Sequence, residues 1–306
     1  MNQQMIAAGI VLFNPDSEER LFKCIEKVNE QVSKIYIFDN STQRKDIKLP
    51  QNVVYMTEGK NKGIAYALNR IMEKASADGF LWVLTMDQDS ILPDNMCLDF
   101  AKYIKKEKDL GIVCPCVIDR RRKYMIGGST NEEYQYINSC ITSASCTSVE
   151  AWKRIGGYDE WLFIDLVDND FCKRLVLSGY KILRLNKWVL DQEFGNIIPK
   201  SKNTREFWIK LSKVLHNENI AKFSYKKFVS PLRVYYTNRN IIYLNRKMKN
   251  FGKVGYENYN CSGYAGFIFA FLIPSIIRAQ DKKRVISATI HGIADGWRSH
   301  PVEWNI

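Results

Sequence analysis

The chain has 306 residues, enough to bury a large core, and we expect one sizeable domain with an appendage rather than two equal domains. Its composition, with 46% hydrophobic and 25% charged residues, is that of a globular protein and excludes a disordered or fibrous chain. The formal net charge of +12 favours an anionic partner: a nucleic acid, an anionic membrane surface or a phosphorylated substrate.

The eight cysteines contain no Cys-x-x-Cys motif and no zinc-ligand spacing, so we expect no structural zinc site. Most of them have apolar neighbours, which predicts small core residues in a reducing compartment. The N-terminus lacks a basic segment followed by a long apolar run, so no signal peptide is expected. Together these features predict a cytoplasmic protein.

Strands and helices are expected to alternate along the first two thirds of the chain. This order predicts an α/β sheet in which polar residues follow several strands at one rim. Apolar runs predict strands at 6–13, 35–38, 53–56, 81–86, 111–117, 181–185 and 188–190. Helical spacing of apolar residues predicts a first helix that is capped by Asp16 and continues to Val32, and further helices at 63–75, 94–106, 148–155 and 165–178.

From about residue 203 the pattern becomes helical, with helices expected at 207–215 and 232–248. Residues 263–277 are apolar, but we expect this stretch of fifteen residues, which contains Pro274, to be too short to cross a bilayer. It could be a packing face of a soluble helix, or a helix in the membrane interface with the basic residues 282–284 on anionic headgroups. We therefore predict a domain at 1–225 and a helical region at 226–306. The helical region is the part that could contact a membrane.

The most informative motif follows the apolar run at 81–86. Asp87 and Asp89 stand two residues apart directly after it, where the end of a parallel strand meets the ligand-binding rim of a sheet. Two carboxylates there suit a hard divalent cation that also binds a substrate phosphate. The motif alone leaves a second interpretation open, in which both aspartates only cap a turn.

Three further groups could carry chemistry. Asp39 ends the second strand and could accept hydrogen bonds from a nucleobase or cap the next turn. Asn61 and Gly63 precede a helix whose free N–H groups and dipole would favour a diphosphate, although ordinary helix initiation explains them as well.

The third group is the acidic helix start at 165–170. Asp168 could act as a general base facing an acceptor hydroxyl, although carboxylates at a helix start are also favoured by the dipole. Asp170 and Arg174 are better explained as a structural i, i+4 pair. The aromatic loop before this helix offers Tyr158 and Trp161 as acceptor contacts.

Taken in order, these motifs resemble family 2 glycosyltransferases with the GT-A fold. The resemblance extends from residue 1 to about 225, and residues 230–240 further resemble the rhamnosyltransferase subgroup, with galactofuranosyltransferases close by. The motifs are Asn14-Pro15, Ile37-Phe38-Asp39-Asn40-Ser41, Asn61-Lys62-Gly63-Ile64-Ala65-Tyr66-Ala67-Leu68-Asn69, Met86-Asp87-Gln88-Asp89-Ser90, Gly156-Gly157-Tyr158-Asp159-Glu160 and Asp168-Asn169-Asp170-Phe171-Cys172-Lys173-Arg174-Leu175.

The resemblance implies a role for each matching residue. Asp39 would contact the nucleobase of a nucleotide-sugar donor, Asp87 would lie near the ribose, and Asp89 would coordinate Mg²⁺ or Mn²⁺ at the diphosphate. Asp168 would be the base of a single inverting displacement. Asn14, Asn61 and Gly63 complete the predicted donor site.

One position departs from the family pattern. Relatives often have a histidine, which can help to hold the metal or the diphosphate, where this chain has Gln192. A neutral amide is a poorer cation ligand than imidazole, so metal dependence could be weaker, or Asp191 or Glu193 could substitute.

The leading hypothesis is an inverting, metal-assisted transferase that moves rhamnose from dTDP-rhamnose onto a saccharide or lipid-linked acceptor of a bacterial surface polysaccharide. It would work in the cytoplasm, at the inner face of the plasma membrane. A UDP-sugar transferase for galactofuranose or a hexose is the nearest alternative. A basic protein that binds nucleic acid through residues 120–123 and 222–227 would leave the rim carboxylates unexplained, so we expect no nucleic-acid partner. A catalytically inactive scaffold of a polysaccharide assembly complex would leave them unexplained as well.

Overall fold

The computed structural model describes residues 5–15, 17–42, 48–119, 121, 132–192 and 197–305, with Asp191 described for its backbone only. The chain divides into two compact units. The first unit comprises Met1–Ile118 and Ser129–Gln192, and the second comprises Asp119–Gly128 and Glu193–Ile306. The domain boundary predicted after residue 225 stays a prediction.

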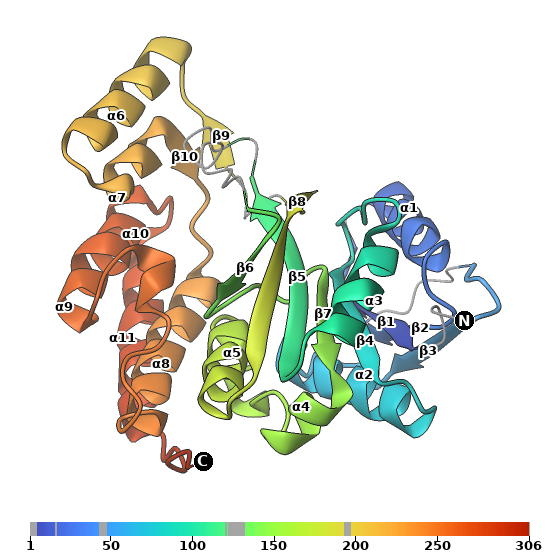
Figure 1. Cartoon of the computed structure of the whole chain (residues 1–306). Coiled ribbons are helices and arrows are strands. Elements are labelled where there is room, and N and C mark those ends of the chain that lie inside the picture. Colours follow the sequence, from blue (N-terminus) through green and yellow to red (C-terminus); the bar gives the residue numbers. More distant parts are fainter. Residues whose placement is uncertain are drawn as a thin grey trace. The chain divides into compact units, whose positions relative to one another are not determined.

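One mixed sheet of eight strands forms the centre of the first unit, in the order β3-β2-β1-β4-β7-β5-β8-β6 (Figure 1). The strands β3, β2, β1 and β4 run parallel to one another, β7 is antiparallel to both of its neighbours, and β6 is antiparallel to β8. The bounds are β1 Ile6–Leu12, β2 Ile35–Asp39, β3 Val53–Thr57, β4 Trp82–Asp87, β5 Leu110–Ile118, β6 Tyr134–Ile137, β7 Ser145–Ser148 and β8 Lys181–Asp191.

Helices cover both faces of this sheet. The helices α1 and α3 pack with alternate strand residues such as Ala8 and Ile10 in one apolar core, whereas Ile71 of α2 lies directly over Gly9 on the opposite face. On this evidence the predicted α/β architecture is confirmed. The bounds are α1 Glu18–Asn29, α2 Ile64–Ala77, α3 Met96–Lys106, α4 Val149–Arg154, the 3₁₀ turn η2 Glu160–Leu162 and α5 Val167–Leu177.

Two details of the sheet differ from the predictions. The strand β7 was not expected, because its sequence Ser-Cys-Thr-Ser lacks apolar alternation, yet all four residues are buried between β4 and β5. The segments predicted as two strands at 181–185 and 188–190 are the single strand β8, which bulges where its register against β5 shifts between Pro115 and Cys116.

The second unit consists of helices and one two-stranded antiparallel sheet. The long helices α8 and α11 lie side by side (Figure 1). The bounds are β9 Ile197–Pro199, β10 Tyr225–Lys227, α6 Lys202–Val214, α7 Glu218–Ala221, the 3₁₀ turns η3 Lys222–Ser224 and η4 Tyr256–Tyr259, α8 Pro231–Lys247, α9 Tyr264–Phe267, the π-helical segment η5 Ile268–Leu272, α10 Ile273–Arg278 and α11 Lys282–Arg298.

The apolar segment of this unit is longer than we expected. Among the described residues, Tyr256–Arg278 spans 23 residues and passes the length and composition test for a membrane-crossing helix, so the apolar segment extends beyond the fifteen residues that we expected. Its continuous helix, Tyr264–Arg278, has fifteen residues and includes the π-helical segment. Only 11% of the tested window is buried.

Candidate active site

The carboxyl ends of three neighbouring strands meet at one rim of the sheet. In the parallel register, Leu12 of β1 pairs with Asp39 of β2, and Val11 pairs with Asp87 of β4. Because these strands run in the same direction, the polar residues that end them are brought to the same edge. The expected rim of Asp39, Asp87 and Asp89 is thus present in the structure.

Asp87 is the last residue of β4, and Asp89 lies in the turn that follows the strand. Between them, the amide of Gln88 accepts a hydrogen bond from the Phe13 N–H (2.9 Å) and donates one to the Phe13 carbonyl (3.2 Å). This amide ties the turn to the end of β1. Asp89 is exposed, and the described residues provide no recorded partner for its carboxylate, so this group is available to a cation or a ligand.

Gln192, at the position where relatives often have histidine, reaches this turn from the end of β8. Its side-chain N–H donates to Oδ2 of Asp87, and its Oε1 is buried with no hydrogen-bond partner among the described residues. A buried acceptor without a donor is costly, and a cation or a ligand donor beside it would remove that cost. Within the part of the chain that is described, no group of three or more His, Cys, Asp and Glu residues is arranged to hold a metal.

Asp39 is 3% exposed, and both of its oxygens have partners within the protein. Oδ1 accepts from the Ser41 N–H (2.8 Å), and Oδ2 accepts from the Tyr55 hydroxyl. The Ser41 hydroxyl in turn accepts from the N–H of Asn14 (2.7 Å), which has a left-handed backbone. The structure therefore links Asp39 and Asn14 through Ser41, and the turn-capping role of Asp39 is present whether or not it also contacts a nucleobase.

The entry to α2 is more fully hydrogen-bonded than we expected. The Lys62 N–H donates to Asn40 Oδ1 (3.1 Å), the Gly63 N–H to Asn61 Oδ1 (2.9 Å) and the Ile64 N–H to the Phe163 carbonyl (2.7 Å). The expectation of free backbone donors is therefore wrong for these three groups. Gly63 has a φ of 88°, and an added Cβ would lie 2.7 Å from the Phe163 carbonyl oxygen, so glycine is required here.

Asp168 lies in the first turn of α5, directly after a strained segment. Phe163, Asp165 and Leu166 have left-handed backbones with φ values of 61°, 66° and 62°. Non-glycine residues rarely adopt this conformation, and such strain is concentrated at functional sites. Burial, and to a lesser extent the neighbouring Cys140 and Asp165, raise the pKa of Asp168 to about 7. A carboxylate with a pKa near neutrality is suited to accept a proton from a hydroxyl.

The segment at 140–145, of which residues 143–145 are buried, connects the two acidic regions. At one end the Ser143 hydroxyl accepts from the Asp87 N–H (3.3 Å), and at the other the sulfurs of Cys140 and Cys172 lie 3.8 Å apart, one helical turn after Asp168. Sequence reasoning did not identify this connection, because the segment contains no recognisable motif. All eight cysteines are free, and five of them are buried, as their apolar neighbours predicted.

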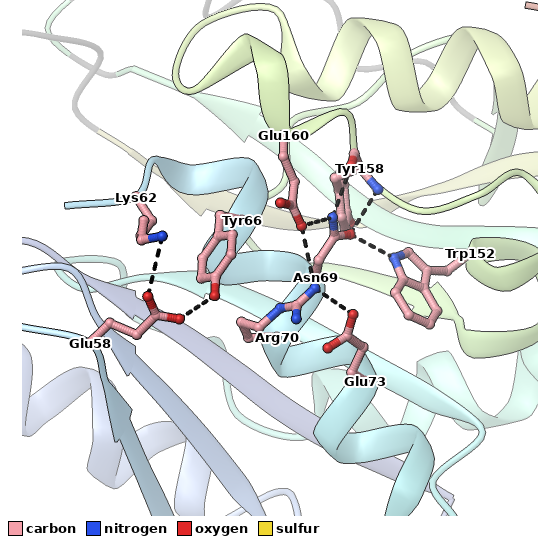
Figure 2. Close-up of polar contacts among 9 residues, drawn as sticks. All are labelled: Glu58, Lys62, Tyr66, Asn69, Arg70, Glu73, Trp152, Tyr158 and Glu160. Carbon is pink, nitrogen blue, oxygen red and sulfur yellow. Dashed lines mark hydrogen bonds and ion pairs between the residues drawn. The ribbon is translucent and has the colours of Figure 1, made fainter. Parts of the chain in front are cut away.

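Asn69 of α2 forms three hydrogen bonds with the turn at 156–160 and a fourth with Trp152 of α4 (Figure 2). Its Nδ2 donates to the Tyr158 carbonyl and to Glu160 Oε1 (both 2.9 Å), while its Oδ1 accepts from the Tyr158 N–H (2.9 Å) and from the Trp152 ring N–H (3.1 Å). All hydrogen-bonding capacity of the amide is thereby used. Asn69 belongs to the motif at 61–69, but its sequence position alone predicted no role for it.

The same turn is held from α5 by a buried ion pair. Arg174 binds Asp170 Oδ2 through Nε (2.8 Å) and through Nη2 (2.5 Å), and it also donates to the Ile155 carbonyl (2.6 Å) and the Gly157 carbonyl (2.8 Å). The predicted structural i, i+4 pair is confirmed. Asn69 and Arg174 together fix the turn between α4 and α5.

The two aromatic residues expected to contact an acceptor have different surroundings. Tyr158 is 4% exposed and stacks on Phe171 with a centroid distance of 4.1 Å, so an acceptor contact by its ring stays a prediction without support from the structure. Trp161 is 37% exposed at the tip of the same loop. Of the basic turn at 120–123, only Arg121 is described, and it forms an ion pair with the buried Asp119 (3.0 Å).

Comparison with known proteins supports the motif-based resemblance. The family model for glycosyl transferase family 2 matches residues 8–146. The dTDP-rhamnosyl transferase RfbF of Shigella flexneri is 27% identical over 259 aligned residues, which cover 79% of this chain and 80% of that protein.

Among solved structures, GalNAc-T7 with UDP, GalNAc and Mn²⁺ matches with a TM-score of 0.53 and 12% identity, over 89% of this chain and 57% of that one. This likeness supports the fold alone. The mannosyltransferase PcManGT of Pyrobaculum calidifontis, in complex with GDP-Man and Mn²⁺, has a TM-score of 0.49 and 10% identity, over 97% of this chain and 76% of that one. Residues 8–146 thus form a family 2 glycosyltransferase domain, and the chain as a whole resembles a rhamnosyltransferase of this kind.

Proposed function

We propose that this glycosyltransferase moves rhamnose from dTDP-rhamnose, with inversion, onto a saccharide or lipid-linked acceptor in the synthesis of a bacterial surface polysaccharide. The observation that carries the choice of donor is the alignment with a dTDP-rhamnosyl transferase, because it covers 79% of the chain and so continues well beyond the family domain. This relative supports rhamnose as the sugar and dTDP as the nucleotide of the donor. The proposed acceptor and polysaccharide rest on the resemblance of the sequence motifs to the family.

The chemistry of the transfer is proposed to depend on Asp168. Its pKa of about 7 allows the carboxylate to be ionised under physiological conditions and still to accept a proton from the attacking hydroxyl. Attack by that hydroxyl on the face opposite the leaving diphosphate gives inversion in one displacement. Trp161, exposed on the loop before α5, is the proposed acceptor contact.

The donor site is proposed at the rim formed by β1, β2 and β4. Asp39 and Asn14 would contact the nucleobase, Asp87 the ribose, and the entry of α2 at Asn61 and Gly63 would approach the diphosphate. Since the N–H groups of Lys62, Gly63 and Ile64 already have acceptors, this last contact would need other groups or a rearrangement of the loop.

A divalent cation, Mg²⁺ or Mn²⁺, fits the donor atoms at this rim. The carboxylates of Asp89 and Asp87 and the Oε1 of Gln192, which has no hydrogen-bond partner among the described residues, are hard oxygen donors that both ions accept. When bound, the ion would supply positive charge to the diphosphate as it leaves. Asp89 is the proposed principal ligand, and the Gln192 oxygen offers a replacement for the imidazole of relatives.

Calorimetric titration of the purified chain with dTDP and with UDP, each with and without Mg²⁺ or Mn²⁺, tests this proposal. We expect micromolar, metal-dependent binding of dTDP. Preferential binding of UDP would favour the alternative, a galactofuranose or hexose transferase of the same fold. Binding of neither nucleotide, together with tight and salt-sensitive binding of nucleic acid, would refute the transferase proposal.

A cytoplasmic location follows from the donor, since nucleotide sugars are cytoplasmic metabolites, and it is part of the proposal. A lipid-linked acceptor would require the enzyme to work at the inner surface of the plasma membrane.

A further inference from the structure

The charge of the chain is distributed very unevenly. Residues 193–306 contain 19 Lys and Arg against 7 Asp and Glu, whereas residues 1–192 contain 26 of each. The whole net charge of +12 therefore belongs to the part of the sequence that forms most of the second unit. Residues 1–192, which include the whole first unit and the proposed donor site, carry no net charge, so the excess charge does not serve to attract the nucleotide.

Exposed apolar side chains are concentrated in the same part of the chain. Of 21 large apolar residues that the structure records as exposed, 14 lie between residues 198 and 302. Scattered single residues of this kind are normal, but an accumulation beside basic residues is typical of a binding surface. The segment η5 has no buried residue at all.

The helix α11 shows this most clearly. Val285, Thr289, Gly292 and Gly296 form its buried side, so the face that packs inward consists largely of small or polar residues. An added Cβ at Gly292 would lie 2.4 Å from the Tyr235 carbonyl oxygen of α8, which shows how closely the two backbones approach.

The apolar residues of α11 point outward instead. Ile286, Ile290 and Trp297 are 41%, 59% and 62% exposed, and the half-buried Ile293 completes a stripe with a spacing of four, three and four residues. This spacing keeps all four on one side of a helix. The distribution is the reverse of that expected for a helix whose outer side faces water.

Two further features accompany the stripe. Phe269, Ile273 and Ile277 of η5 and α10, which precede α11 in the chain, are 72%, 38% and 66% exposed at helical spacing. Lys282, Lys283 and Arg284 begin α11, and all three are exposed. Aromatic and aliphatic side chains suit the boundary of the acyl chains of a bilayer, and lysine and arginine suit its anionic headgroups. Both kinds of side chain lie next to each other here.

We propose that α11, together with the exposed side of η5 and α10, binds the surface of an anionic lipid bilayer. Ile286, Ile290 and Trp297 enter the boundary of the acyl chains, and Lys282 and Lys283 bind the headgroups. The continuous helix Tyr264–Arg278 is about 22 Å long, shorter than a hydrocarbon core of about 30 Å, so this segment lies on the membrane and does not cross it. The proposal adds a partner to the proposed transferase without resting on it, because binding to a bilayer needs no donor.

Sedimentation of the full chain with lipid vesicles tests the proposal. We expect strong binding to phosphatidylcholine vesicles that contain phosphatidylglycerol and weak binding to phosphatidylcholine alone. The double variant Ile286→Asn, Ile290→Asn should bind about tenfold more weakly or worse. Its matched control is Leu81→Asn, Leu98→Asn, which changes two comparably exposed residues of the first unit (57% and 45%) and should bind as the unchanged chain does.

Charge is tested in the same way. Lys282→Gln, Lys283→Gln should lower the affinity for the anionic vesicles by about 25-fold, since each basic residue near such a surface contributes about fivefold. The matched pair Lys105→Gln, Lys106→Gln, exposed at the end of α3, should change it little. Circular dichroism confirms that each variant folds, and nucleotide titration reports the donor site separately.

Four results would overturn the proposal: no binding to anionic vesicles, equal losses in test and control variants, retention in vesicles after alkaline carbonate extraction, or conversion of a dimer to a monomer by the isoleucine variant. Retention after carbonate extraction would show a membrane-spanning segment. Conversion of a dimer to a monomer would show that the stripe contacts a second copy of the chain.

Discussion

Replacing Asp168 by Asn should stabilise the folded protein above neutral pH while abolishing transfer. In the folded chain, burial raises the pKa of this carboxyl from 3.8 to about 7. The folded state therefore binds the proton more tightly than the unfolded state does, and the free energy of unfolding must fall as the pH rises from about 4 to about 7. Asparagine does not titrate, so this contribution to the pH dependence of the free energy of unfolding is absent from the variant.

The difference between the two pKa values corresponds to about 4 kcal/mol at most. The side chain is only half-buried, and water will reduce this amount, so we expect Asp168→Asn to raise the free energy of unfolding at pH 8 by about 2 kcal/mol. Near pH 4 the two proteins should be almost equally stable. Urea-induced unfolding of both proteins at several pH values measures the difference.

A matched variant two residues away should have the opposite effect. Asp170→Asn makes the same chemical change in the same helical turn, but it breaks the buried pair with Arg174 and should cost about 3–5 kcal/mol. For transfer, Asp168→Asn should lower the rate by 100-fold or more, and the wild-type rate should fall tenfold per pH unit below about pH 7. Destabilisation by Asp168→Asn at every pH, or an acid limb of the rate near pH 4, would refute this account of the base.

Three other variants test separate parts of the structure. Asp89→Ala should leave folding unchanged, because the side chain is exposed, but should remove the metal dependence of nucleotide binding in calorimetry; an unaltered metal response would exclude Asp89 from the site. Asn69→Ala should lower the free energy of unfolding by about 3 kcal/mol or more in urea, because Trp152 and Tyr158 lose their buried partners; a loss below about 1 kcal/mol would contradict that. Gly292→Ala should destabilise the α8–α11 pair by about 1–3 kcal/mol in thermal unfolding, whereas the exposed Ser287→Ala should have little effect, and equal effects would show that the two backbones do not approach closely.

Most of the fold could be predicted because its elements have clear local signals. The strand β4 is a continuous apolar run, and the helices α1, α2 and α3 each bury one periodic face. The strand β7 could not be predicted in the same way. Its burial depends on its neighbours, as when the Thr85 hydroxyl donates to the Ser145 carbonyl (3.1 Å), and such partners are not visible in a short polar segment.

In the candidate site, too, residues with a local sequence signal could be predicted, and contacts between distant residues could not. Asp87, Asp89 and Asp168 could be identified because each stands at the start or end of a predictable element. The bond between Gln192 and Asp87, which joins residues 105 positions apart, depends on the order of the strands in the sheet. The burial of Tyr158 and the bonded N–H groups at Gly63 also depend on tertiary contacts, so sequence spacing gave an incomplete description of both.

The loop between α4 and α5 is anchored at its base and open at its tip. Asn69 and Arg174 hold the backbone around Gly157 and Tyr158 from two different helices, while Trp161 lies exposed beyond them. Substitutions at the tip can therefore alter the surface that we propose contacts the acceptor with little loss of stability, and substitutions at the base cannot. Related enzymes could diverge in acceptor preference by exchanging a few side chains at such a tip while keeping the same supporting framework.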